Sequence, residues 1–441
     1  MHYGIISIIP VLLVFVIAFK TKKTFESLFI GSIAGFLILD KQKFLESWLE
    51  TLLNVLANET VLWVIIVTFF FGAMINLFEK TGALNGFANF TENYAKSSKD
   101  SLVIAWFISL LFFIDDYLHN LVIGSAMKKV TDKHKISRAK LAYLTNSTAG
   151  NLASLVPIST WAVFYAGLMS ENGLSVADSG MKGYIKTIPY QFYPIVAIII
   201  SFLVAIFILP DLGAMKKSEL MSKDKEQLKN SEKKEEQISI WYFFIPIIVL
   251  IIVTIVTEIN VLNGILGALI SIGITMIPTK KVKAGEYMEI VMEGFANMIP
   301  IACILGIAFT LMEANTRLGL ADFIIETVQP FMSGACLPVV VFLTAVVFAY
   351  FTGMFWDMAA ILFPIAIPLA IGVGANPYLV AATIFSASSW GSQVCMYGDA
   401  VVINAGACEI SPTEHSITTL PYGLLGVGIS AILYFIMGFI I

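Results

Sequence analysis

The chain has 441 residues, of which 58% are hydrophobic and 13% are charged, and its formal net charge at pH 7 is −4. Because a soluble domain carries about 25% charged residues, this composition excludes an ordinary soluble protein and predicts an all-α polytopic membrane protein. The four cysteines lack the CxxC spacing of a zinc or redox site, and the small net charge gives no reason to expect a nucleic acid as a partner.

The first apolar run, Tyr3 to Phe19, is predicted to span the membrane rather than to act as a signal peptide. Its basic residues Lys20, Lys22 and Lys23 follow the run instead of preceding it, and no small-residue cleavage site comes after them. In the rest of residues 1–210 we expect four more spans, an interfacial stretch and one re-entrant hairpin.

Two acidic residues, Asp115 and Asp116, interrupt the apolar stretch from Leu102 to Met127. A carboxylate at bilayer depth costs about 2.5–3.5 kcal/mol, so chains keep one mainly where it faces water, a cation or a substrate path. Two arms of about thirteen residues reach roughly 20 Å, which brings a hairpin tip near the middle of the membrane. This tip also carries His119 and Asn120 as candidate ligands. Alternatively, one aspartate only caps the second arm, and His119 is an ordinary hydrogen-bonded interior residue.

The next apolar segment is interrupted by small polar side chains and is predicted to be a broken helix. Amide and hydroxyl oxygens, with the carbonyls freed by an unwound turn, are hard donors that suit Na⁺, and half-helix N-termini suit an anionic group. The alternative is that these side chains bond carbonyls within their own helix. The candidate ligands are Asn146, Ser147, Thr148, Asn151, Ser159 and Thr160.

The two halves of the chain resemble each other. The run from Gly72 to Glu79 corresponds to that from Gly306 to Glu313 at an offset of 234 residues, and Ala142 corresponds to Ala381 at an offset of 239. Ordered matches at a nearly constant spacing indicate duplication. The stretch 211–240, rich in Lys and Glu, is predicted to be a solvated, partly helical linker. We therefore expect a first repeat over 1–210 and a second over 241–441.

The second repeat contains a hairpin tip and a broken helix that match those of the first. The tip, 351–357, offers Thr352, Trp356 and Asp357, the last of these at an offset of 241 from Asp116. Either tryptophan of this region, Trp356 or Trp390, could equally be a packing residue. The broken helix offers Ser386, Ser388, Ser389, Trp390 and Gln393, and Asp399 beyond them either holds Na⁺ or caps a turn.

The distribution of Lys and Arg predicts the orientation, because these residues stay on the cytoplasmic side of short loops. Five spans in each half is an odd number, so the second repeat must be inverted. With the N-terminus outside and the linker in the cytoplasm, only five of the 27 basic residues lie outside: Lys41, Lys43, Lys182, Lys186 and Arg317. This arrangement predicts a multi-pass protein of the cell membrane.

The run FIDDYLHNLVIGSAMKKVTDKHKISRAKLAYLTNSTAGNLASLVPISTWA resembles the signature region of the NhaC family of Na⁺/H⁺ antiporters, and TGMFWDMAAILFPIAIPLA extends the resemblance into the second half. The resemblance implies an inverted-repeat fold with two hairpins, a homodimer and an elevator-like movement. Antiporter-like members tend to have an Asp where this chain has Asn146, and a Gly-Asp-His-Cys-Ser-Pro-type stretch where this chain has 391–399.

These departures remove candidate proton carriers and favour transport of a small organic solute, a carboxylate or an amino acid, coupled to Na⁺ or H⁺. Strict Na⁺/H⁺ exchange without an organic solute is the alternative. The doubled, discontinuous sites argue against a channel, and the chain lacks a Walker motif and the nucleophile or metal cluster of an enzyme. No cofactor is expected besides Na⁺ as the coupling ion, with Asp116, Asn146, Ser147, Asp357 and Ser386 as its candidate ligands.

Overall fold

The computed structural model describes residues 3–21, 23–84, 86–87, 94–113, 115–157, 159–224, 239–257, 260–328, 334–353 and 355–441. Apart from one isolated bridge, the regular elements within these ranges are helices, so the all-α prediction is confirmed. The first half contains α1 (Ile9–Thr21), α2 (Thr24–Asp40), α3 (Phe44–Ala57), α4 (Glu59–Lys80), α6 (Ser98–Ser109), α7 (Asp116–Lys133), α8 (Arg138–Leu155), α9 (Thr160–Glu171), α10 (Gly180–Thr187) and α11 (Phe192–Ala205). After α12 (Gly213–Asp224) come α13 (Trp241–Val256), α14 (Val261–Met276), α15 (Ala284–Arg317), α16 (Leu320–Val328), α17 (Leu337–Thr352), α18 (Phe355–Gly372), α19 (Pro377–Val394), α20 (Asp399–Ala407) and α21 (Pro412–Ile440).

Fewer helices are long enough to cross a membrane than the five spans per half that the sequence predicted. Among the described residues, four helices pass by length and composition, namely α4, α15, α17 and α21, and two bent pairs raise the number to six. Part of the shortfall has a simple cause: α13 and α14 have 16 residues each, and a helix of that length reaches only about 24 Å of a hydrocarbon core about 30 Å thick.

Breaks in the helices fall close to the predicted positions. The segment 110–115 separates α6 from α7, and the two helices pack against each other. A bend of 42° separates α8 from α9. In the second half, Gly353 separates α17 from α18 with a φ of +70°, and a Cβ there would lie 2.5 Å from the Tyr397 ring. Only glycine fits at such a turn without strain.

Matching helices recur in the two halves of the chain. Both α7 and α18 have 18 residues, as do α8 and α19, and the members of each pair start 239 positions apart. This offset equals the one predicted from Ala142 and Ala381. It pairs Asp116 with Phe355 rather than with Asp357, because the two aspartates lie 241 positions apart.

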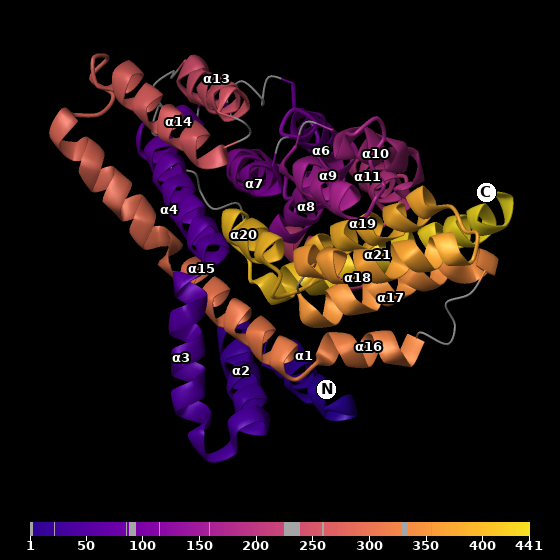
Figure 1. Cartoon of the computed structure of the whole chain (residues 1–441). Coiled ribbons are helices and arrows are strands. Elements are labelled where there is room, and N and C mark those ends of the chain that lie inside the picture. Colours follow the sequence, from indigo (N-terminus) through magenta and orange to yellow (C-terminus); the bar gives the residue numbers. More distant parts are fainter. Residues whose placement is uncertain are drawn as a thin grey trace.

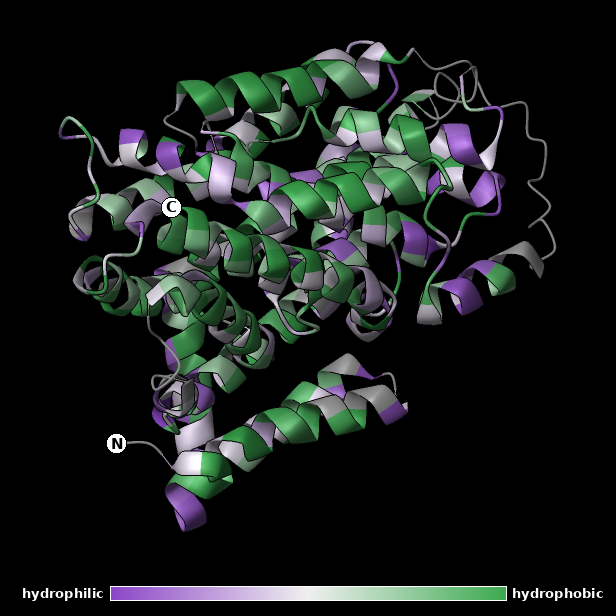
Figure 2. Cartoon of the chain, turned by 90° about the vertical axis from the view of Figure 1, so that its right-hand side faces the viewer, coloured by the Kyte–Doolittle hydropathy of each residue, from purple (hydrophilic) through white to green (hydrophobic). Residues whose placement is uncertain are grey.

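The helices gather into two lobes, as Figure 1 shows. We call α1–α4 with α13–α15 the long-helix lobe, and α6–α11 with α17–α21 the core lobe; each therefore draws on both halves of the chain. The lobes meet where α4 contacts α7 and where α15 contacts α20. Hydrophobic residues cover most helix surfaces, as expected of a protein surrounded by lipid (Figure 2).

The long-helix lobe depends on a close crossing of α4 and α15. A Cβ on Gly294 would lie 2.5 Å from the Cα of Ala73, and one on Gly72 would lie 2.7 Å from the carbonyl oxygen of Gly294. Backbones approach this closely only where both helices present small residues, which is how helices associate in membranes without a hydrophobic driving force.

Gly294→Leu is expected to lower the thermal stability of the purified protein markedly, because the backbone of α4 cannot move away from the added side chain. Overpacking of this kind costs about 1–3 kcal/mol. The matched control is Gly285→Leu on the same helix, where a Cβ meets nothing within 4 Å. Thermal melts of both variants in detergent measure the difference, and equal melting temperatures would contradict the crossing.

Candidate functional site

The acidic pair lies at the start of α7, inside the core lobe. Asp115 caps the helix: its Oδ1 accepts hydrogen bonds from the backbone N–H groups of Tyr117 and Leu118, both at 3.0 Å. Its Oδ2 accepts from the hydroxyl of Thr160 at 3.0 Å. The capping role considered from the sequence is thus correct for Asp115, and it leaves the neighbouring Asp116 for other contacts.

Asp116 is 1% exposed and bonds to two elements of different halves. Its Oδ1 accepts from the indole N–H of Trp161 at 3.0 Å, and its Oδ2 from the hydroxyl of Ser392 at 3.4 Å. Gly150 leaves room for this meeting, because a Cβ there would lie 3.2 Å from the Ser392 hydroxyl and 3.3 Å from Trp161. The carboxylate therefore sits between the broken helices α8–α9 and α19–α20.

A third carboxylate, Asp399, begins α20 and is also buried. Its Oδ2 accepts a hydrogen bond of 2.6 Å from the Tyr117 hydroxyl, and its Oδ1 accepts from the backbone N–H of Ala400 at 2.7 Å. Tyr117 follows Asp116 directly, so this bond brings Asp399 to the hairpin tip. The ring of Tyr117 also packs on Trp63 of α4, with centroids 6.2 Å apart, at the border between the two lobes.

The three carboxylates have no basic partner among the described residues. Within the described parts of the chain, Asp115, Asp116 and Asp399 form no ion pair, and their partners are hydroxyl, indole and backbone N–H groups. Each lies at the N-terminus of a helix or bonds to a residue there, where the helix dipole favours negative charge. A buried carboxylate is costly unless it is paired or neutralised, and the described residues supply no positive charge to these three.

Amide side chains line the next turn of α7. The Nδ2 of Asn120 donates to the Oδ1 of Asn146 at 3.1 Å, while the Oδ1 of Asn120 is buried and has no partner in the described structure. Residues four apart share one face of a helix, so Asn120 lies on the face of α7 that carries Asp116. Its free oxygen is therefore available close to the acidic pair.

Asn146 itself is held by the opposite half of the chain. Its Nδ2 lies 3.3 Å and 3.2 Å from the carbonyl oxygens of Ser392 and Gln393, and 3.0 Å from the Nε2 of His415. Because carbonyl oxygens only accept, the amide orientation is fixed. The Oδ1 of Asn146, a candidate Na⁺ ligand from the sequence, is thus occupied by Asn120.

A second group of amides surrounds Gln393. Its Nε2 donates to the hydroxyl of Ser147 at 2.7 Å, and its Oε1 accepts from Tyr193 at 2.8 Å and from Asn151 at 3.1 Å. The Nδ2 of Asn151 also donates to the carbonyl of Ser147, and its Oδ1 is buried without a partner in the described part of the chain. A second unpaired amide oxygen therefore lies in the interior of the core lobe.

Several other candidates bond to groups outside this network. His119 lies 3.1 Å from the carbonyl oxygen of Phe112 and 3.0 Å from the hydroxyl of Thr148. Ser159 caps α9. In the second half, Thr352, Ser386, Ser388 and Ser389 bond respectively to the Phe348 carbonyl, the Tyr434 hydroxyl, the Phe355 carbonyl and the Phe385 carbonyl.

Two tryptophans and one aspartate complete the list of predicted residues. Trp356 packs on Trp161 with ring centroids 4.7 Å apart, so it adjoins Asp116 through that ring. Trp390 packs on Tyr350, and its indole N–H has no partner in the described structure. The backbone of Asp357 belongs to α18, whereas its side chain lies outside the described residues.

The sequence prediction missed several members of the network. His415 and Asn404 are single polar residues inside apolar runs, and polar groups at membrane depth are expensive and usually functional. That rule, applied to neutral side chains as well as to acids, would have found both. Ser392 stands next to a predicted residue. Tyr117 and Tyr193 carry no such signal, because a tyrosine in an apolar run is ordinary. The missed residues are Tyr117, Tyr193, Ser392, Asn404 and His415.

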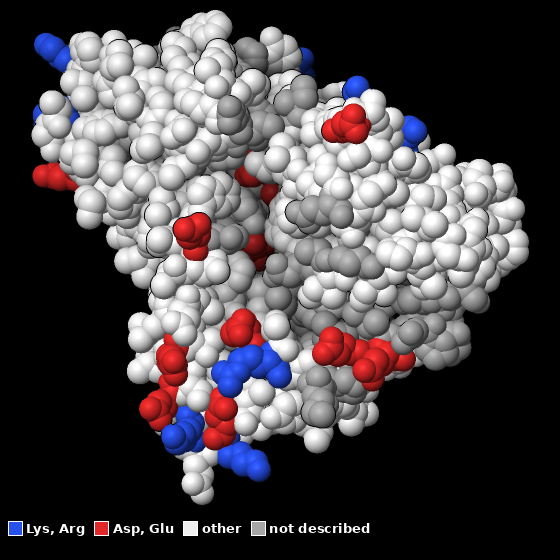
Figure 3. All heavy atoms as spheres, viewed as in Figure 1, with Lys and Arg blue, Asp and Glu red and all other residues white. Residues whose placement is uncertain are grey.

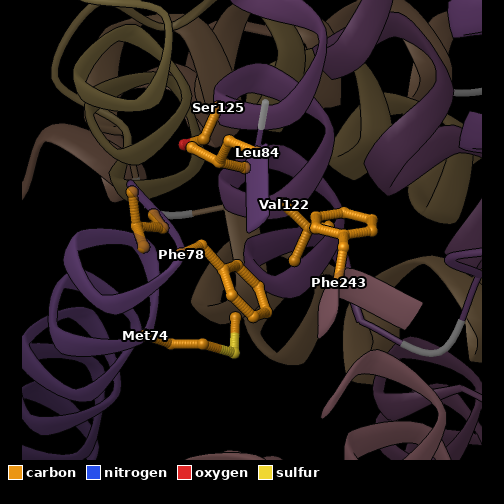
Figure 4. A pocket seen from close by; sticks show the side chains of 7 residues that line it. Met74, Phe78, Leu84, Val122, Ser125 and Phe243 are labelled. Atoms are coloured by element: carbon orange, nitrogen blue, oxygen red, sulfur yellow. The ribbon is translucent and has the colours of Figure 1, made fainter. Parts of the chain in front are cut away.

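The groove between the lobes passes close to the site. Figure 3 shows this face hollowed between the lobes, with acidic side chains set back inside the groove. A small, mostly apolar pocket lies between α4, α7 and α13 and has room for about one water molecule. Met74, Phe78, Val122 and Phe243 line it (Figure 4). The lobes thus contact each other here through apolar side chains.

Charged residues close one end of the core lobe. Glu409 pairs with Lys128 of α7 and with Arg138 of α8, and Arg138 also pairs with Asp132 at 3.0 Å. Partial burial raises the pKa of Glu409, but hydrogen bonds and charges from Lys128 and Arg138 outweigh it and lower the pKa below its ordinary value. This network ties the first-half helices to the connection between α20 and α21.

The described residues contain no group of three His, Cys, Asp or Glu side chains that could hold a metal ion. Helices that qualify as spans and bent pairs place the chain among multi-pass membrane proteins. Buried acids between broken helices are typical of secondary transporters.

The Na⁺/H⁺ antiporter family matches residues 152–439, about two thirds of the chain, and the chain belongs to this family. It is therefore a secondary transporter and not an enzyme, in agreement with the resemblance found in the sequence. The chain is similar to an uncharacterized protein of Haemophilus influenzae, with 24% identity over 479 residues that cover 98% of this chain and 91% of the relative. Among solved structures it is similar to MtrF of Neisseria gonorrhoeae, described as one of a class of antimetabolite efflux pumps, with 13% identity, coverage of 89% and 83%, and a TM-score of 0.38.

Proposed function

We propose that the chain moves Na⁺ or H⁺ through the acidic site of the core lobe and couples this movement to transport. One observation carries the proposal: three buried carboxylates lie together without a basic partner among the described residues. Isolated charge of this kind is costly in a low-dielectric interior, so the site must hold a proton or a metal cation for much of its cycle.

The cation ligands that we propose differ in part from those expected from the sequence. Asp116 supplies charge, and the unpaired Oδ1 atoms of Asn120 and Asn151 supply neutral oxygens. The oxygens of Asn146 and Ser147 already accept hydrogen bonds from Asn120 and Gln393. Hard cations prefer such carboxylate and amide oxygens. Asp357 and Ser386 remain proposed second-half ligands, although Ser386 bonds to Tyr434 in this structure.

Coupling follows from the charge of the site. When the bound cation and protons together neutralise the three carboxylates, the site can move through an apolar environment; the empty, ionised site moves far less readily, because burying charge is expensive. Na⁺ and H⁺ therefore compete for one carboxylate and travel in exchange. This mechanism needs no ATP and no cofactor.

An elevator-like movement of the core lobe against the long-helix lobe is the proposed route. Its support is that each lobe combines corresponding helices of both halves and that α7 and α8 recur as α18 and α19. Two inverted repeats, 1–210 and 241–441, an outside N-terminus and a cytoplasmic linker belong to this proposal. So does a homodimer in the cell membrane, with the long-helix lobes in contact.

A small organic solute, a carboxylate or an amino acid, is the second candidate cargo. Aromatic rings beside the acidic pair favour it: Trp161 bonds to Asp116 and packs on Trp356 at 4.7 Å, and Phe164 packs edge-on against Trp356 at 4.8 Å. Pockets for organic ligands are lined by apolar and aromatic side chains with a few polar groups. In this version Na⁺ fills the acidic site and the solute lies against the rings.

Proteoliposomes with an internal pH indicator test both versions. A pulse of external Na⁺ drives Na⁺ inward in exchange for protons and should therefore alkalise the interior, whereas choline should do nothing. A parallel thermal-shift screen tests amino acids and carboxylates with and without Na⁺. Stabilisation by Na⁺ alone favours exchange of ions, and a ligand that stabilises only with Na⁺ favours solute coupling. No response to Na⁺ or to pH in either assay would refute the proposal.

A further inference from the structure

His415 contacts amide side chains that come from two other helices of the core lobe. It is fully buried in the second turn of α21. Its Nε2 lies 3.0 Å from the Nδ2 of Asn146 on α8 and 3.4 Å from the Nδ2 of Asn404 on α20. One ring nitrogen thus faces amide N–H groups from both halves of the chain.

The orientation of both amides decides the state of the ring. The Nδ2 of Asn404 also donates to the carbonyl of Ala142 at 2.8 Å, and its Oδ1 accepts from Thr145 at 2.8 Å. Asn146 is fixed in the same way by two carbonyl oxygens. Since both amides present N–H groups, Nε2 must accept. The proton of the neutral ring is therefore on Nδ1, which lies 3.3 Å from the hydroxyl of Thr419.

The orientation of Asn146 also determines the orientation of Asn120, whose Oδ1 has no partner among the described residues. With Asn146 donating to the ring and to the carbonyls, its Oδ1 faces Asn120 and accepts the Asn120 N–H. Asn120 then turns its own Oδ1 away from Asn146, and that oxygen is the unpaired one. An amide reversed at either position would offer N–H groups to a cation in place of an oxygen.

We propose that His415 is a positioning residue of the cation site: as the neutral Nδ1–H tautomer it accepts from Asn146 and Asn404 and, together with the carbonyl oxygens of Ser392 and Gln393, holds Asn146 in the orientation that keeps the Asn120 oxygen available as a ligand. The inference rests on the proposed function. The groups in hydrogen-bond contact with the ring are all neutral, namely Asn146, Asn404 and Thr419. Asn404 is also contacted by a titratable group, Cys408, whose sulfur lies 3.9 Å from its Oδ1.

Two variants of His415 distinguish a role in orienting the amides from a role in filling space. His415→Leu removes the acceptor, so a buried N–H group of Asn404 loses its partner and the Asn146 amide is held by the two carbonyl oxygens alone. The KM for Na⁺ should therefore rise about tenfold with little change in the maximal rate. His415→Gln keeps an acceptor oxygen and should restore the KM to within about threefold of the unmodified protein. The matched control is Ser430→Ala, which removes a buried hydroxyl of α21 whose one hydrogen bond among the described residues goes to the Gly426 carbonyl. Equal KM values in all variants, or equal losses in Leu and Gln, would overturn the proposal.

A direct measurement of the ring state does not depend on transport. The chain has four histidines, so selective ¹⁵N-histidine labelling gives a short spectrum in which His415→Gln identifies the signals of interest. The expected result at pH 7 is a protonated Nδ1 and an unprotonated Nε2. A protonated Nε2 overturns the inference even if Na⁺ moves normally, whereas a normal tautomer in a protein that moves no cation refutes only the proposed function.

Discussion

Asp116→Asn is expected to reduce Na⁺-dependent proton movement in proteoliposomes to the level of empty vesicles while the protein still folds. The amide has the shape of the carboxylate and can still accept from the Trp161 indole at its oxygen. It removes only the charge, and with it the reason for a proton or Na⁺ to bind. Flux is measured with an internal pH indicator, and folding with thermal melts of the same preparation.

The matched control is Asp115→Asn, one residue earlier. Asn is as good a helix N-cap as Asp, so the bonds to the Tyr117 and Leu118 N–H groups survive this change. Because Asp115 is engaged by the cap and by Thr160, its variant should keep a substantial part of the flux. The assignment fails if both Asp116→Asn and Asp357→Asn transport at the normal rate.

The position of the site could be predicted from the sequence because polar residues stand out in apolar runs. The acidic pair, the break before α7 and the break between α8 and α9 follow from that contrast alone. The rule that membrane interiors exclude unpaired charge applies to any chain, so it needs no knowledge of the fold. Duplication then located the corresponding breaks in the second half.

The partners of these residues could not be predicted, because they come from distant parts of the chain. Tyr117 meets Asp399 across 282 positions, and Asn146 meets His415 across 269. Within one helix, the rotation per residue decides which side chain faces the site. Ser392 reaches Asp116, whereas Ser386 in the same helix bonds to Tyr434 on α21. Composition and spacing carry no information on that rotation.

The contacts of the linker, residues 211–240, could not be predicted from the sequence either. Its content of Lys and Glu predicted a solvated, partly helical segment. Its first part does form a helix, α12, but this helix contacts α8 and α21. Nothing in the sequence indicated this contact. Lys140, the buried residue that pairs with Glu219 of α12, stands in a run of basic residues that is typical of a solvated loop. A charge run predicts solvent exposure only where nothing of opposite charge packs on it.

Lys140→Met is expected to destabilise the protein by about 3–5 kcal/mol, the usual cost of removing one partner from a buried ion pair. Lys140 is 1% exposed, and its Nζ lies 2.7 Å from Asp211 and 3.4 Å from Glu219, whose side chain is 6% exposed. Glu219 also accepts from the backbone N–H of Ser137 at the start of α8. Without the lysine, this carboxylate stays buried beside an apolar side chain.

Two further variants distinguish the cost of leaving a carboxylate buried without a counter-charge from the cost of losing any ion pair. Lys283→Met breaks the exposed pair with Glu286 and should leave the melting temperature nearly unchanged, because solvent screens such pairs. Combining Lys140→Met with Glu219→Gln removes the uncompensated charge and should recover part of the loss, because pairs of contacting residues are not additive. Thermal melts in detergent rank the three proteins. Equal stability of Lys140→Met and Lys283→Met would mean that α12 is not docked on the core lobe, and the segment after residue 211 would then join the halves only as a tether.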